Sequence, residues 1–131
     1  MNAKNKILII DDDPDIVESL KVILEAEGFN VISSLKADEG LIKAKQENPD
    51  LILLDVMMTQ IDSGFDAARV LRQDPKTKDI PIIILTALKE KTGFDFYAEA
   101  GDQDWLPVDD YLEKPVKREE LLSIIKKFLK D

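Results

Sequence analysis

The chain has 131 residues with no cysteine and no histidine, and 27 acidic residues against 18 basic ones give it a net charge of −9. That length suits one domain over residues 1–131, and the missing residue types exclude cysteine redox chemistry, typical zinc enzymes, serine–histidine hydrolases and phosphohistidine donors. The negative charge argues against binding to nucleic acids and to anionic membranes. No apolar run approaches ~18 residues, and the first residues lack the apolar core of a signal peptide, so we expect a cytoplasmic protein.

Short apolar runs alternate with amphipathic stretches along the chain. Lys6–Ile10 predicts a buried strand, Asp13 and Pro14 suit the start of a helix, and Gly28 can close that helix. A second strand is predicted at Asn30–Ser33. The elements predicted next are a helix over Ala37–Glu47, a strand over Leu51–Leu54, a helix marked by Phe65, Ala68 and Leu71, and a strand over Pro81–Leu85.

The stretch before the fifth strand is irregular. A helix is expected between Lys89 and Ala100, but Thr92-Gly93 interrupts it, and residues 101–110 have the composition of a long loop. A short strand then follows at Tyr111-Leu112. The last helix is the clearest, with an apolar stripe at Leu121, Ile124, Ile125, Phe128 and Leu129.

This alternation predicts right-handed crossovers and a parallel sheet that is covered on both faces. In such sheets, ligands bind beyond the carboxyl ends of the strands. Three carboxylates, a hydroxyl and an ammonium are expected at that edge, from Asp11, Asp12, Asp55, Thr86 and Lys114. Carboxylates repel each other unless a cation joins them, and a lysine and a hydroxyl beside them suit a phosphoryl group. The pattern therefore favours Mg²⁺-dependent phosphorylation of an aspartate.

Each of these residues also has an ordinary explanation when it is taken alone. An aspartate after a strand usually caps a helix or lies in a loop, and Asp13 is best interpreted as such a cap. A lysine such as Lys114 is most often a solvated loop residue. The set is much more specific, because four separate strand ends each supply the residue type that a phosphoryl site needs.

Four motifs carry a family resemblance: Ile7-Leu8-Ile9-Ile10-Asp11-Asp12-Asp13-Pro14, Leu53-Leu54-Asp55-Val56-Met57-Met58, Ile84-Leu85-Thr86-Ala87 and Asp110-Tyr111-Leu112-Glu113-Lys114-Pro115. With them the chain resembles the response-regulator receiver domain of two-component signalling, and the chemotaxis regulators in particular, over about Lys6–Leu129. The resemblance implies an α/β, flavodoxin-like, doubly wound five-stranded parallel sheet of order 2-1-3-4-5. It implies about five helices, of which we expect the fourth to be short or irregular.

The resemblance also implies a role for each site residue. It makes Asp55 the phosphoacceptor. The implied ligands of Mg²⁺, for which Mn²⁺ can substitute, are Asp11, Asp12, Asp55 and the backbone carbonyl of Met57. The implied phosphoryl-binding residues are Thr86, Ala87 and Lys114, and the implied switch residues are Thr86 and Tyr111. The Lys–Pro peptide bond is commonly cis in this family, and the resemblance extends this to Lys114-Pro115.

The implied function is that of a phosphoacceptor in a phosphorelay, not that of an enzyme, although a receiver assists its own phosphoryl uptake and hydrolysis. The donor would be a histidine kinase or a His-containing phosphotransfer protein, and the output a downstream protein target. The motifs fit both a stand-alone receiver and part of a longer regulator. A pseudo-receiver, which binds proteins without phosphorylation, is the second interpretation. A haloacid-dehalogenase-like phosphatase is disfavoured because Met57 stands where its second aspartate is needed.

Two segments depart from the family pattern. After Asp55, residues 58–64 lack the usual proline and the loop is one residue longer. The segment around Trp105 is also longer than usual, and two interpretations stay open for it. Trp105, Leu106 and Val108 could form a partner-binding surface, or they could fold back over a short fourth helix.

Overall fold

The computed structural model describes residues 5–55, 63–86 and 109–129, with the backbone alone at 63–66 and 86. Its strands are β1 (Lys6–Ile10), β2 (Asn30–Ser34), β3 (Leu51–Asp55), β4 (Ile82–Thr86) and β5 (Asp110–Glu113). Its helices are α1 (Pro14–Ala26), α2 (Ala37–Glu47), α3 (Ser63–Gln73) and α6 (Arg118–Phe128). Within these ranges, no helix is long and apolar enough to cross a membrane.

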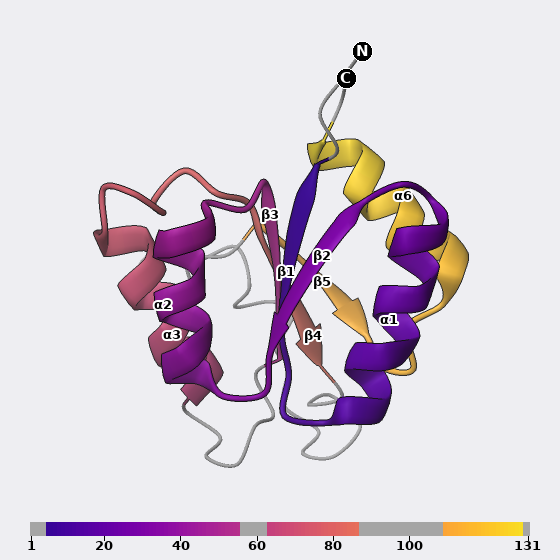
Figure 1. The fold of residues 1–131 in the computed structure, drawn as a ribbon, viewed down its shortest axis with the longest axis horizontal. Helices are drawn as coiled ribbons and strands as arrows, with labels where there is room; N and C mark the ends of the chain where they lie inside the picture. Colours follow the sequence, from indigo (N-terminus) through magenta and orange to yellow (C-terminus); the bar gives the residue numbers. More distant parts are fainter. Residues whose placement is uncertain (1–4, 56–62, 87–108, 130–131) are drawn as a thin grey trace.

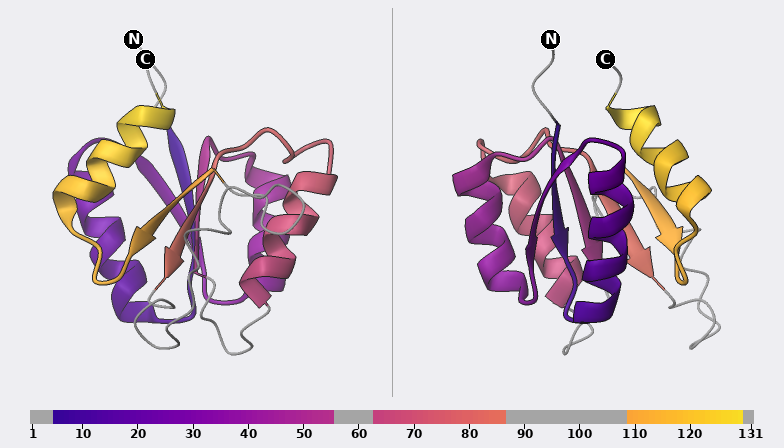
Figure 2. Two further views of the ribbon diagram at one scale, coloured as in Figure 1. Left: turned by 180° about the vertical axis from the view of Figure 1, so that it is seen from behind. Right: turned by 45° about the vertical axis from the view of Figure 1, so that its right-hand side comes forward.

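The five strands form one sheet of order β2-β1-β3-β4-β5, and every neighbouring pair is parallel. The sheet lies between two layers of helices: α2 and α3 cover one face, and α1 and α6 cover the other (Figures 1 and 2). The predicted flavodoxin-like, doubly wound sheet is therefore confirmed. The expected fourth helix falls in 87–108, outside the described residues.

Two apolar clusters hold these layers together, and the period of two along each strand divides the side chains between them. In β1, Ile7 and Ile9 pack toward α1 and α6, whereas Leu8 and Ile10 pack toward α2 and α3. All four side chains are fully buried. Burying a side chain of this size contributes roughly 1.5–3 kcal/mol, so continuous apolar strands of this kind are stable only between two helical layers.

Helix α1 begins and ends as its sequence predicts. The Asp13 side chain accepts a hydrogen bond of 2.9 Å from the backbone N–H of Asp15, and Pro14 takes the first helical position. The chain leaves the helix through Gly28, whose φ of 95° lies in the left-handed region that glycine tolerates. The Asp13 cap sets where α1 begins, directly after Asp11 and Asp12 at the end of β1.

At the amino ends of β4 and β5, Arg72 of α3 joins segments that are distant in the sequence. Its Nη1 donates to the carbonyls of Lys78 and Ile80, at 2.9 and 2.8 Å, and its Nη2 contacts the Asp109 carboxylate. The same carboxylate accepts from the backbone N–H of Ile82 at 2.8 Å. Asp109 lies one residue before β5, in the loop that the sequence predicts, and these contacts hold it against the sheet.

Candidate phosphoryl and metal site

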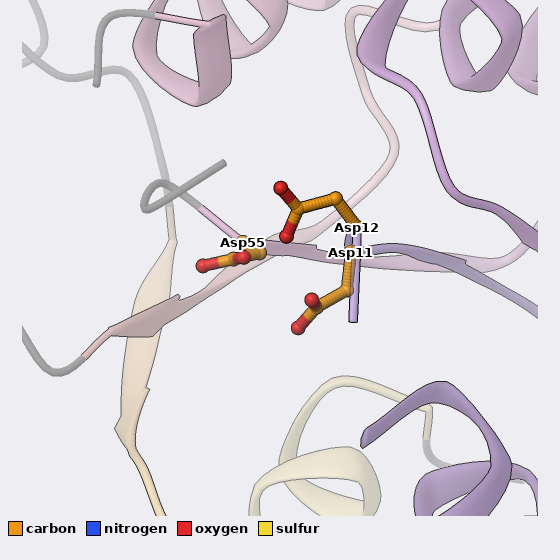
Figure 3. Close-up of side chains that lie close together, drawn as sticks. All are labelled: Asp11, Asp12 and Asp55. Atoms are coloured by element: carbon orange, nitrogen blue, oxygen red, sulfur yellow. The ribbon is translucent and has the colours of Figure 1, made fainter. Parts of the chain in front are cut away.

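Three carboxylates meet at the carboxyl edge of the sheet, because β1 and β3 are direct neighbours. Ile10 pairs with Leu54 in the ladder, so the residues that follow them, Asp11 and Asp55, lie side by side. One carboxylate oxygen from each of Asp11, Asp12 and Asp55 lies within 4.8 Å of the other two. Figure 3 shows Asp11 and Asp12 on opposite sides of the end of β1, with Asp55 beside them at the end of β3.

Lys114, which follows β5, joins two of these carboxylates. Its Nζ lies 3.0 Å from Asp11 Oδ2 and 3.3 Å from Asp55 Oδ1. The side chains of Asp11 and Asp55 are only 0% and 1% exposed, whereas that of Lys114 is 17% exposed. The ammonium therefore neutralises charge that water does not reach, and it still keeps a path to solvent.

The two oxygens of Asp11 have different surroundings. Oδ1 accepts the backbone N–H of Asp13 at 2.9 Å, which holds the carboxylate against the start of α1. Oδ2 is buried and receives no hydrogen bond of good geometry from the described residues, so its contact with Lys114 is an ion pair defined by distance. A buried carboxylate oxygen with spare lone pairs is a ready ligand for a cation.

The electrostatics of the site follow from this burial. The pKa of Asp11 is raised from its ordinary 3.8 to about 6, mainly by burial and in part by the nearby Asp55 charge, while the Asp13 amide and Lys114 act the other way. Burial also acts to lower the pKa of Lys114, but the carboxylates of Asp55 and Asp11 outweigh it and raise that pKa above its ordinary value. The cluster thus carries more negative charge than one ammonium neutralises.

This donor set fits a hard divalent cation. Mg²⁺ prefers oxygen ligands and keeps several waters, so two or three carboxylates at one edge are enough to hold it. The chain contains neither histidine nor cysteine, the residues that zinc prefers. Asp11, Asp12 and Asp55 could therefore hold Mg²⁺ through oxygen alone, and Asp11 Oδ2, which accepts no hydrogen bond of good geometry from the described residues, gives it a binding point.

The other predicted site residues are placed only in part. Thr86 ends β4, beside β3 on one side and opposite Glu113 of β5 on the other, and its side chain is not described. Tyr111 lies half-buried against the apolar cluster under α2 and α3. The Lys114-Pro115 bond is cis. Met57, Ala87, Trp105, Leu106 and Val108 lie outside the described residues, so their predicted roles stay predictions.

Comparison with known proteins identifies the family. The model of the response regulator receiver domain matches residues 7–126, so the chain belongs to that family. A receiver is a phosphoacceptor module of two-component signalling and not a classical enzyme, and its class implies a histidine kinase as partner.

Two curated relatives of similar sequence differ in how much of their length the chain covers. It is 40% identical over 129 residues to the DNA-binding dual master transcriptional regulator RpaA of Synechocystis, covering 95% of this chain but 49% of that protein. It is 37% identical over 120 residues to Protein PilH of Pseudomonas aeruginosa, covering 92% of this chain and 93% of that protein. The chain thus spans about half the length of RpaA, as it does for the regulators MtrA and PhoB, and nearly all of PilH.

Solved structures have the same fold. The chemotaxis protein CheY4 of Vibrio cholerae superposes with a TM-score of 0.83 at 28% identity, over 97% of this chain and 100% of that one. The PA1611 receiver of Pseudomonas aeruginosa, with a magnesium ion in its active-site cleft, gives 0.80 at 27%, over 96% and 98%. TrrA of Thermotoga maritima, in complex with Mg²⁺ and BeF, gives 0.77 at 35%, over 95% and 99%.

Proposed function

We propose that Asp55 is the residue that takes the phosphoryl group, from a phosphohistidine of a histidine kinase or a His-containing phosphotransfer protein. The observation that carries this assignment is the position of Asp55 at the end of β3: it is 1% exposed, lies beside the Asp11 and Asp12 carboxylates, and forms an ion pair with the Lys114 ammonium. The chain has no histidine, so the donor histidine lies outside residues 1–131.

The chemistry follows from these neighbours. An Asp55 carboxylate oxygen attacks phosphorus, the N–P bond of the donor breaks, and its electron pair returns to the imidazole nitrogen, which takes up a proton. Lys114 orients the phosphoryl oxygens and offsets their charge. The acyl phosphate that forms on Asp55 is the signalling state of the chain.

The metal in this proposal is Mg²⁺, held by Asp11, Asp12, Asp55 and the backbone carbonyl of Met57, with Mn²⁺ as a substitute. When bound, it would neutralise the negative charge that spreads over the transferring phosphoryl oxygens. The three carboxylates support this choice, and so does Asp11 Oδ2, which is buried and accepts no hydrogen bond of good geometry from the described residues. The magnesium ions in the PA1611 receiver and TrrA structures support it too.

The switch in this proposal consists of Thr86 and Tyr111, with Ala87 leaving room for the phosphoryl group. Thr86 moves toward a new phosphoryl oxygen, and Tyr111 turns into the space that the threonine leaves. The half-buried position of Tyr111 against the cluster under α2 and α3 supports this, because an inward turn then adds contacts. Phosphorylation can shift the equilibrium between the two states only by the difference in its interaction energy with them.

The output side of the proposal comes from the sequence alone. Residues 1–131 would form one receiver domain in the cytoplasm, and Trp105, Leu106 and Val108 would contact a downstream protein. Because Trp105 is the single tryptophan, its emission is a clean probe of that contact. An emission that neither phosphorylation nor the partner alters, with a large loss of stability in Trp105→Ala, would assign these residues to packing.

Intact mass spectrometry after incubation with acetyl phosphate and Mg²⁺ tests the assignment of Asp55. We expect the mass of one added phosphoryl group, its loss with EDTA, and its loss in Asp55→Asn. Asp38→Asn is the matched control, since Asp38 is exposed on α2, and it should be phosphorylated like the wild type. An unchanged mass shift in Asp55→Asn would refute the assignment, and no shift in any protein would favour a pseudo-receiver.

A further inference from the structure

Lys114, the residue proposed to bind the phosphoryl group, follows a strand that is only lightly packed. β5 lies at the edge of the described sheet, beside β4 (Figure 2). Of its four residues only Leu112 is buried, whereas all five residues of β3 are buried. Because buried side chains specify the register of a strand, packing alone sets the position of β5 along β4 only weakly.

A polar anchor holds β5 at its amino end. The register that pairs Ile83 with Asp110 places Asp109 opposite Ile82, the first residue of β4. The backbone N–H of Asp109 donates to the Ile82 carbonyl at 2.9 Å, and the Asp109 carboxylate accepts the Ile82 N–H at 2.8 Å. Asp109 thus engages both backbone polar groups of Ile82, which fixes where the pairing of β4 with β5 begins.

Arg72 of α3 holds this anchor in place. Its Nη2 contacts the Asp109 carboxylate, while its Nη1 donates to the carbonyls of Lys78 and Ile80, at 2.9 and 2.8 Å. The planar guanidinium therefore joins Asp109 to the segment that leads into β4. The Arg72 and Asp109 side chains are 18% and 34% exposed, so the geometry of these contacts, more than charge alone, makes the anchor specific.

We propose that Arg72 is a positioning residue for Lys114, on which it acts through Asp109 and the register of β5. The inference rests on the proposed role of Lys114 at the phosphoryl site. A shift of β5 by one residue would move Lys114 by about 3.3 Å along the strand. That shift is as large as the distances from its Nζ to Asp11 Oδ2 and Asp55 Oδ1, 3.0 and 3.3 Å, so it would break these contacts. The register therefore keeps the ammonium where the phosphoryl oxygens arrive.

The rate at which acetyl phosphate phosphorylates the protein at saturating Mg²⁺ tests the inference. Intact mass spectrometry follows this rate under conditions in which every variant compared is folded. Misplacing a group at a reactive site by about 1 Å can cost up to ~10²-fold in rate, so a β5 that is displaced for part of the time should slow Arg72→Met about tenfold. Lys45→Met is the control: it removes a more exposed ion pair, with Asp74, and should change the rate less than about twofold.

A double variant separates positioning from a general loss of structure. If Arg72 acts through Lys114, the substitution Arg72→Met should add little to the slower rate of Lys114→Met. A structural defect would instead slow the wild type and Lys114→Met by the same factor. The Mg²⁺ affinity of Arg72→Met, measured by calorimetry, should not fall, because the three carboxylates of the site lie at the ends of β1 and β3.

The two ends of the anchor give a second pair of variants, which also serves if Arg72→Met is too unstable to assay. Asp109→Ala removes the acceptor of both Arg72 and the Ile82 N–H, so it should slow phosphorylation as Arg72→Met does. Asp109→Asn keeps an amide oxygen that can accept the same two donors, and it should recover most of the wild-type rate.

A wild-type rate in Arg72→Met or in Asp109→Ala would overturn the inference alone, and so would equal slowing by Arg72→Met with and without the Lys114 ammonium. If Lys114→Met is phosphorylated as fast as the wild type, the proposed role of Lys114 fails and the inference fails with it. A wild-type protein that gains no phosphoryl mass would refute the assignment of Asp55 itself.

Discussion

Gly40 of α2 touches Ile10 of β1 so closely that a Cβ on the glycine would lie 2.5 Å from Ile10 Cδ1 and 2.7 Å from its Cγ1. Helix α2 therefore packs directly on the strand whose end carries Asp11 and Asp12. A glycine inside a helix costs about 1 kcal/mol relative to alanine, and the fit against Ile10 offsets that cost.

Gly40→Ala should lower the free energy of unfolding by about 1–2 kcal/mol, because overpacking costs roughly 1–3 kcal/mol and the gain in helix propensity returns up to about 1. Denaturant unfolding measures this loss. Ile10→Val removes the methyl group nearest to the new Cβ, so the double variant should lose less than the sum of the two single losses. Additive losses would show that α2 absorbs the Cβ elsewhere.

The pH dependence of stability should carry the signature of Asp11. Its pKa is about 6 in the folded protein against an ordinary 3.8, so the folded state binds the proton more tightly than the unfolded chain does. Stability from this group is therefore present below about pH 4 and is lost as pH rises through about 6, by roughly 3 kcal/mol at most.

Denaturant unfolding in EDTA over that range checks the prediction. Asp11→Asn cannot titrate, yet its amide oxygen can still accept the Asp13 N–H, so it serves as the control. Its stability should fall less than that of the wild type between pH 4 and 6. Equal slopes in the two proteins would mean that Asp11 titrates close to its ordinary value.

The Arg72–Asp109 pair should contribute more to stability than an ordinary surface ion pair. The Arg72 side chain is 18% exposed and holds two carbonyls as well as the Asp109 carboxylate, whereas the ion pair of the more exposed Lys45 is with Asp74, at 3.1 Å. We expect Arg72→Met to cost about 2–3 kcal/mol and Lys45→Met less than about 1. Denaturant unfolding compares the losses of unfolding free energy in the two variants. Similar losses would show that Arg72 contributes no more than an ordinary surface ion pair.

These contacts also show what the sequence could and could not predict. The strands were readable because apolar runs such as Leu51–Leu54 fit only a sheet buried on both faces, and the edge bearing Asp11 and Asp55 followed from parallel packing. Lys114 was predicted to meet a phosphoryl group, but its ion pair with Asp11 depends on side-chain geometry. The Arg72–Asp109 contact joins residues 37 positions apart, beyond the reach of any local pattern.

Thr86→Ala should separate metal binding from switching, because the threonine hydroxyl is proposed to meet the phosphoryl group and not the metal. Mg²⁺ affinity should stay at the wild-type value, while the response of Tyr111 to phosphorylation should be lost. Tyr111 pairs with Ile84 across β4 and β5, and both pack in the cluster under α2 and α3, so the Ile84 methyl groups report on the ring.

Methyl NMR on the wild type and on Thr86→Ala, each with Mg²⁺ and beryllium fluoride, makes that comparison. The Ile84 signals should move in the wild type and stay in place in the variant, because the aromatic ring then keeps its position. Ile83 faces α1 and α6 on the other side of the sheet, and its methyl groups should respond alike in both proteins. Equal Ile84 shifts in the two proteins would mean that the phosphoryl signal reaches Tyr111 without Thr86.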